Sequence, residues 1–260
     1  MKLFVTTHPA VQQPAPTLVC LHGWGMNRLI WQPLQPHLTQ YFNLLCVDLP
    51  GHGNSDWQPG PPSVALVQHW AHAILAILPP VSVILLGWSL GALLAWELVR
   101  QVPQRITAWI AVAASPCFVQ RPDWPLALPH SALKQLAQDL QHQSQQALRQ
   151  FLFWQCQTDP KRKAILRQCQ PLIDSPLPST ATLQEGLALL RDTDYRPHLP
   201  TLRPGTLILG EQDPLVPLGI GPQITHLAPH WRLEIMATAG HLPFLSNPAA
   251  FMNILQKAVL

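Results

Sequence analysis

The sequence predicts an α/β fold, in which helices flank a mostly parallel central sheet and a helical insertion interrupts the alternation. Short apolar runs typical of buried strands alternate with helical patterns over the first 115 residues, and this alternation favours parallel strands covered by helices. The strand pattern stops over 116–194 and resumes after 195. A chain of 260 residues can bury one large core, or a core with a smaller lid.

Two patterns identify the elements of the core. A short apolar run predicts a buried strand, and apolar residues at i, i+3 and i+4 predict a helix. Expected strands cover 3–6, 17–21, 44–47, 81–86 and 106–113, followed by 206–209 and 232–236. Expected helices cover 28–39, 63–78, 89–102 and 248–258.

Residues 116–194 contain no convincing strand pattern and many prolines. Leu133, Leu136 and Leu140 recur at helical spacing, as do Leu148 and Phe151. A helical insertion in an α/β domain is commonly a lid over the site. We therefore expect a core made of 1–115 and 195–260, with 116–194 as a helical lid.

The composition excludes several classes of protein. Charged residues make up 11% of the chain and the net charge is +3, whereas nucleic-acid-binding proteins usually carry a denser basic patch. Five scattered cysteines without a CxxC pair or zinc-type spacing indicate reduced thiols. No apolar run approaches the ~18 residues of a membrane span, and residues 1–10 contain no signal-peptide core. We expect a cytoplasmic protein without nucleic-acid or membrane partners.

Ser89 is the candidate nucleophile. It lies at the centre of GWSLG (87–91), where a buried strand is expected to turn sharply into a helix. Glycines on both sides allow the backbone to approach its neighbours, and the helix N-terminus favours developing negative charge. G-x-S-x-G also arises by chance, but the strand before it and the helix after it favour a nucleophile.

A serine hydroxyl needs a general base, and the base needs a carboxylate that orients it. His241 is the candidate base, because AGHLPF follows the last expected strand, where α/β sheets place their sites. Asp213, in GEQDPLVP, is the candidate carboxylate. Asp48 is its alternative, although the sequence DLPGHGNS suits a structural loop better.

Two main-chain N–H groups are expected to bind the oxyanion of an acyl-transfer reaction. One belongs to Leu90, directly after the nucleophile, and the other to Trp24 in LHGWG. The alternative for HGWG is a plain glycine turn, in which the Trp24 side chain would form a pocket wall. His22 and His52 lie in loops that face the same site but precede the nucleophile in the chain.

The motifs HGWG, DLPGHGNS, GWSLG, GEQDPLVP and AGHLPF together resemble the α/β-hydrolase superfamily, in that order. The chain order Ser89, Asp213, His241 matches the triads of that superfamily. A narrower set, LLGWSLGALLAWEL, VAASPCF, DWP and FLFWQ, resembles the pimeloyl-[acyl-carrier protein] methyl ester esterase family of biotin synthesis. In that family a Phe-Leu-x-x-Gln stretch of the lid lines the acyl channel, which implies this role for Phe151 and Gln155. Both residues could equally belong to the lid core.

The narrower resemblance implies a reaction and a partner. A serine esterase would cleave the methyl ester of a pimeloyl chain on acyl carrier protein, with no metal or organic cofactor. An acidic carrier protein would bind a basic surface. The lid offers Arg149, Lys161, Arg162, Lys163 and Arg167, which could equally form a solvated helix face. We expect a monomer.

Other functions remain open at this level. A broad carboxylesterase for short acyl esters would use the same three residues, and so would a C–C bond hydrolase or a peptidase on this fold. A protein of another class, a hydrolase-fold receptor that binds a ligand without turnover, could retain them too.

Overall fold

The computed structural model describes residues 1–61, 64–174 and 177–259. Its described residues form a sheet with the strand order β1-β3-β2-β4-β5-β6-β7, in which β1 is antiparallel to β3 and every other pair is parallel. The strands are β1 Val5–His8, β2 Thr17–Leu21, β3 Asn43–Val47, β4 Val83–Trp88, β5 Ile106–Val112, β6 Thr206–Gly210 and β7 Arg232–Met236. The predicted fold class is confirmed.

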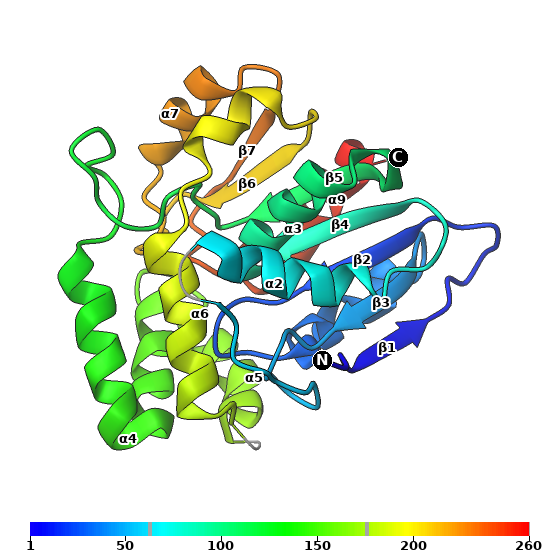
Figure 1. Ribbon diagram of the computed structural model, residues 1–260. Helices are drawn as coiled ribbons and strands as arrows, with labels where there is room; N and C mark the ends of the chain where they lie inside the picture. Colours follow the sequence, from blue (N-terminus) through cyan, green and yellow to red (C-terminus); the bar gives the residue numbers. More distant parts are fainter. Residues whose placement is uncertain (62–63, 175–176, 260) are drawn as a thin grey trace.

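Burial explains why the central strands read as continuous apolar runs. Every residue of β4 and β6 is buried, whereas β7 at the sheet edge has exposed positions. Successive side chains of a strand point to opposite faces of the sheet. Because helices cover both faces, the side chains on both are shielded from water. In Figure 1, α2 and α3 lie in front of the strands and α9 lies behind them.

The helices of the core are short and several are 3₁₀ turns. They are η1 Arg28–Leu34, α1 Gln35–Leu38, α2 Val64–Leu75, α3 Leu90–Gln101, η2 Pro103–Arg105, η3 Arg196–Thr201, α7 Ile220–Leu227, α8 Pro243–Ser246 and α9 Pro248–Val259. Sequence patterns did not predict α7 and α8, because eight- and four-residue helices carry too few turns for a clear periodicity.

Some predicted boundaries were wrong. The helix expected over 28–39 is a 3₁₀ turn followed by one α turn, because Pro33 and Pro36 cannot donate a main-chain hydrogen bond. The strand expected over 81–86 begins at Val83 and continues through Trp88, so the turn is confined to Ser89. The first residue of the helix expected over 63–78 lies outside the described residues.

The described residues of segment 116–194 form three helices, α4 His130–Cys156, α5 Arg162–Asp174 and α6 Thr180–Asp192. They gather beside one end of the sheet in Figure 1. The two helical patterns expected around Leu133 and Leu148 belong to the single helix α4, which is kinked at Gln143 (φ −149°, ψ 71°). Their apolar faces share one core, which includes Leu140, Ile165 and Leu183.

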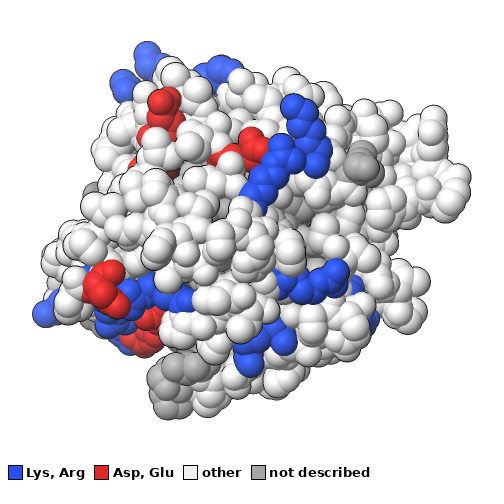
Figure 2. Space-filling model, turned by 90° about the horizontal axis from the view of Figure 1, so that it is seen from above, with Lys and Arg blue, Asp and Glu red and all other residues white. Residues whose placement is uncertain are grey.

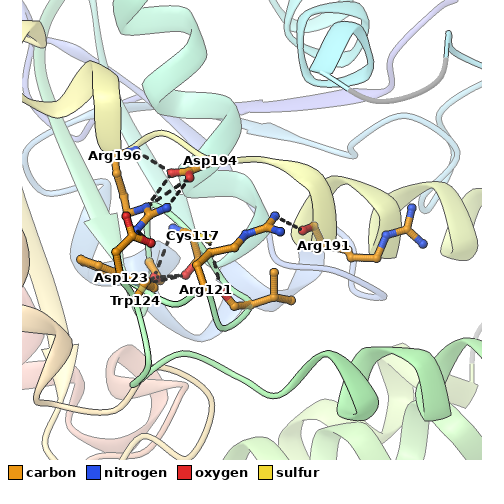
Figure 3. A network of polar contacts seen from close by, with 9 residues as sticks. Cys117, Arg121, Asp123, Trp124, Arg191, Asp194 and Arg196 are labelled. Carbon is orange, nitrogen blue, oxygen red and sulfur yellow. Dashed lines mark hydrogen bonds and ion pairs between the residues drawn. The ribbon is translucent and has the colours of Figure 1, made fainter.

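The chain leaves and rejoins the core through two neighbouring stretches that polar contacts hold together (Figure 3). Arg196 forms ion pairs with Asp123 (2.8 Å) and Asp194 (2.7 Å). Arg121 donates to the main-chain carbonyl of Arg191 (3.3 Å). These contacts fix where segment 116–194 begins and ends relative to the sheet.

Two further features bear on the classes considered above. Over the part of the chain that the structure describes, no helix has the length and apolar character needed to cross a membrane. Within the same residues, no cluster of three or more His, Cys, Asp or Glu side chains could hold a metal ion. All five cysteines are buried and unbridged.

Candidate active site

Ser89 occupies a strained turn between β4 and α3. Its backbone angles are φ 54° and ψ −115°, a conformation that costs a residue with a side chain free energy and that is found mainly at functional sites. A Cβ atom on Gly91 would overlap the main-chain carbonyls of Leu21 and His22, and one on Gly87 would lie 2.5 Å from the carbonyl oxygen of Gly91. The two glycines are therefore required by close packing around the turn.

A chain of hydrogen bonds joins the three side chains predicted from the sequence. Nε2 of His241 lies 3.0 Å from Oγ of Ser89, and Nδ1 lies 2.8 Å from Oδ2 of Asp213. The other oxygen of Asp213 accepts the N–H groups of Leu215 (2.8 Å) and Val216 (3.0 Å). Because the carboxylate can only accept at Nδ1, that nitrogen carries the proton, and Nε2 is free to accept the serine hydroxyl.

Topology explains how residues so far apart in the chain meet. Ser89 follows β4, Asp213 follows β6 and His241 follows β7, and these strands are parallel. Their carboxyl ends share one edge of the sheet, where open α/β sheets bind ligands. All three side chains are buried.

The expected oxyanion donors lie on either side of the nucleophile. Leu90 is the first residue of α3, and Trp24 follows β2 in the loop HGWG. Among the described residues, neither main-chain N–H has a hydrogen-bond acceptor. Both groups therefore remain available to an oxyanion.

The wall opposite the sheet comes from segment 116–194. The ring of Phe151 packs edge-on against Trp24, with ring centroids 5.0 Å apart, and the Trp24 indole N–H donates to the carbonyl of Leu183 (2.9 Å). Gln155 is 2% exposed, and no partner for its Oε1 occurs in the described chain. A buried polar atom without a partner marks a place where a ligand atom or a water molecule can bind.

Comparison with known proteins agrees with this geometry. The family profile described as "alpha/beta hydrolase fold" matches residues 16–248. A pimeloyl-[acyl-carrier protein] methyl ester esterase of Xylella fastidiosa (strain M23) is 40% identical over 248 residues, covering 94% of this chain and 95% of its own. The enzyme of that name from Aeromonas hydrophila is 36% identical over 246 residues, with the same coverage.

The chain belongs to the pimeloyl-[acyl-carrier protein] methyl ester esterase family of α/β hydrolases. This confirms the resemblance drawn from the motifs. Among solved structures, an esterase from Exiguobacterium antarcticum superposes with a TM-score of 0.85 at 23% identity, covering 98% of this chain and 94% of its own. At that identity the likeness shows the fold alone.

Two buried histidines stabilise the loop that carries Trp24 in this family member. The N–H of Leu49 donates to Nε2 of His22 (3.0 Å), and that of Gly25 donates to Nε2 of His52 (3.4 Å). Both rings donate from Nδ1 to main-chain carbonyls, at 2.8 and 2.9 Å. Burial lowers the pKa of His22 to about 4 and that of His52 to about 3, so both are neutral at pH 7.

The structure gives Asp48, the alternative acid, a different set of partners. Its oxygens accept the main-chain N–H and the guanidinium of Arg28 (2.8 and 2.6 Å) and the N–H of Asn54 (3.0 Å). The carboxylate therefore holds the DLPGHGNS loop together.

Sequence reasoning missed two contacts of His241. The Trp88 indole N–H donates to the His241 carbonyl (2.8 Å), and the N–H of His241 donates to the carbonyl of Gln155 (3.1 Å). The letters GWSLG could have suggested a role for Trp88, but no local pattern links Gln155 to a residue 86 positions later.

The basic residues predicted to bind the carrier protein do not lie together, because Arg149 is separated from the others. Arg149 on α4 pairs with Asp174 at the last residue of α5 (2.7 Å). Lys161, Arg162 and Lys163 lie exposed at the other end of α5, about 18 Å away at 1.5 Å per residue. On the face seen in Figure 2, Lys and Arg likewise occur in separate groups on a mostly uncharged surface.

Proposed function

We propose that this protein is a serine carboxylesterase that hydrolyses the methyl ester of pimeloyl-[acyl-carrier protein]. The observation that carries ester hydrolysis is the unbroken hydrogen-bond chain from Asp213 through His241 to Ser89. The choice of ester rests on family membership, because the relatives at 36–40% identity carry that substrate in their names.

The reaction follows from the geometry in two steps. His241 takes the proton of Ser89 as the serine oxygen attacks the ester carbonyl, and the Leu90 and Trp24 N–H groups bind the oxyanion. His241 then gives that proton to the departing methoxide, which leaves as methanol. Water, deprotonated by His241, hydrolyses the acyl-enzyme and releases the acid. Each step uses protein groups and water, so the reaction as written requires no metal or organic cofactor.

Segment 116–194 acts in this proposal as a lid over the acyl chain. Phe151 would provide apolar contact, and the unpaired Oε1 of Gln155 would bind a polar group of the substrate or a water molecule. Ser89 is 6% exposed, so its hydroxyl has little contact with bulk solvent.

The carrier protein would bind to a basic surface of the lid itself. Lys161, Arg162, Lys163 and Arg167 are exposed near the start of α5 and offer an acidic partner a basic surface. Arg149 lies apart from this group and is already paired with Asp174, so it would contribute less.

Methanol release from methyl-pimeloyl carrier protein tests the proposal. The purified protein should release one methanol per ester consumed, and Ser89→Ala should lower the rate by roughly 10³-fold or more. p-Nitrophenyl butyrate serves as the comparison substrate. Turnover of this ester without turnover of the carrier-bound ester would overturn the proposed substrate and leave a general esterase. Ligand-induced stabilisation without turnover of either ester would indicate a receptor.

A further inference from the structure

Asp159 is a buried carboxylate outside the triad. It lies between α4 and α5 and is 1% exposed. Its Oδ1 accepts the N–H of Lys161 (2.7 Å), and its Oδ2 accepts the N–H of Gly240 (2.9 Å). Burying a carboxylate costs free energy unless hydrogen bonds compensate, so both bonds matter to the folded state.

The two oxygens serve different parts of the molecule. The bond to Lys161 closes a local turn directly before α5, of the kind that aspartate side chains often form with the N–H two residues later. The bond to Gly240 crosses 81 positions of the sequence and reaches the residue directly before His241. The local turn does not explain this second bond.

The neighbouring contacts point to the same loop. The N–H of His241 donates to the carbonyl of Gln155 (3.1 Å), so two successive N–H groups of the histidine loop end on the stretch 155–159. Thr158 donates to the carbonyl of Gln212, which precedes Asp213 (2.5 Å). One short stretch of the helical segment therefore contacts the loops of both the base and the acid.

Gly240 is shaped to receive this stretch. A Cβ atom there would lie 3.0 Å from the carbonyl oxygen of Gln155 and 3.4 Å from Cβ of Asp159. Its φ lies outside the left-handed region, so the backbone itself would accept an alanine. The missing side chain thus reflects the close approach of 155–159.

We infer that Asp159 is a positioning residue for His241: it holds the Gly240–His241 backbone so that the imidazole spans Ser89 and Asp213. The inference rests on the proposed function, since it assigns a role in that reaction. A displacement of about 1 Å in a catalytic group can cost about 10²-fold in rate. Loss of the Gly240 contact should therefore reduce kcat rather than substrate affinity.

Asp159→Asn and Asp159→Ser separate positioning from the local turn before α5. Asparagine and serine side chains both form such turns and can accept the N–H of Lys161. Asparagine has a single acceptor oxygen for the two N–H groups, so with that oxygen on Lys161 its amide NH₂ opposes the N–H of Gly240. The serine variant lacks the second oxygen. Asp174→Asn, at the exposed last residue of α5, is the matched control for loss of one negative charge from the helical segment.

The experiment measures kcat and KM for p-nitrophenyl acetate and for the methyl ester on the full chain, together with the melting temperature. We expect both Asp159 variants to lower kcat about 10- to 100-fold for both esters, with KM within about twofold. Asp174→Asn should match the native protein. Gly240→Ala displaces the same contact from the other side and should lower kcat in the same way, which covers the case that an Asp159 variant does not fold.

Several results would overturn the inference. A lower melting temperature with unchanged kcat would limit the role of Asp159 to stabilising the turn before α5. A rise in KM alone would make the stretch 155–159 part of the substrate surface. Absence of turnover in the native protein would instead refute the proposed function, and the positioning role with it.

Discussion

The two walls of the site are built differently. On the core side, His22, His52 and Asp213 are buried and have fixed hydrogen-bond partners. The helical segment is mostly apolar where it faces the core, with Gln155 and Asp159 as buried polar exceptions. Its outer surface is polar, as in the pair Arg149–Asp174 with side chains 50% and 45% exposed. Buried polar groups have no water to replace a lost partner, whereas exposed ion pairs do.

This difference teaches where function should be sensitive to substitution. Groups in the core wall fix the side chains of the proposed triad and the loop that carries a proposed oxyanion donor. Groups on the outer surface of the lid should be replaceable unless a partner binds them. Between the two lie the contacts that join the walls, of which the Trp24–Leu183 hydrogen bond is one.

The largest effect is expected in the core wall, from Asp213→Asn. Two main-chain N–H groups hold Oδ1, so the asparagine amide NH₂ would have to face Nδ1 of His241. The imidazole would then carry its proton on Nε2 and could not accept one from Ser89. We expect kcat to fall roughly 10³- to 10⁴-fold with the fold intact, as in triads of this type. Steady-state kinetics measures kcat, and circular dichroism checks that the fold is intact. Activity within tenfold of native would show that the core wall is not the part most sensitive to substitution.

The next effect is a pH dependence of stability from the neutral histidine pair. The folded pKa values of about 4 for His22 and about 3 for His52 lie below the unfolded value, so the unfolded chain binds protons first as the pH falls. This stability is fully present above about pH 6.5 and decreases toward pH 4, by about 2 kcal/mol per histidine between pH 7 and pH 5.

Urea unfolding across that pH range measures the effect. The slope of the unfolding free energy against pH reports how many protons the chain takes up on unfolding. His52→Gln should lower that uptake by about one proton. His142→Gln, at an exposed position of α4, should leave the slope unchanged. Equal slopes in native protein and His52→Gln would show that the neutral ring of His52 does not cause the pH dependence of stability.

A smaller effect is expected where the walls meet. Trp24→Phe keeps an aromatic ring against Phe151 but removes the indole N–H that donates to Leu183. Trp31→Phe is the control, because its buried indole N–H has no partner among the described residues. We expect Trp24→Phe to lose about 1 kcal/mol more unfolding free energy than the control. Equal losses would mean that this bond does not join the walls energetically.

The smallest effect is expected on the outer surface of the lid. Arg149→Gln removes one partner of an exposed ion pair, and such pairs contribute little because water and salt screen them. The urea midpoint and the rate with p-nitrophenyl acetate should both stay within experimental error of native. A clear loss of stability would give this surface a structural role that its exposure does not suggest.

Much of the core could be predicted from the sequence, because its strands, helices and site loops each have a recognisable local sequence pattern. GWSLG required a turn that only close-packed glycines permit, and the loops after β6 and β7 had to reach the same sheet edge. No sequence pattern indicated the contacts of Asp159 and Gln155 with the His241 loop, because these contacts join positions more than 80 residues apart. The kink at Gln143 was equally hidden, because Gln143 is neither glycine nor proline.

Covalent labelling with a fluorophosphonate tests most directly whether the His241–Asp213 pair activates Ser89. Peptide mass spectrometry should find one adduct per chain, on Ser89. Ser89→Ala should abolish it, and His241→Ala should slow its formation by at least about 10²-fold. An adduct on another residue, or equal labelling rates in native protein and His241→Ala, would contradict the account.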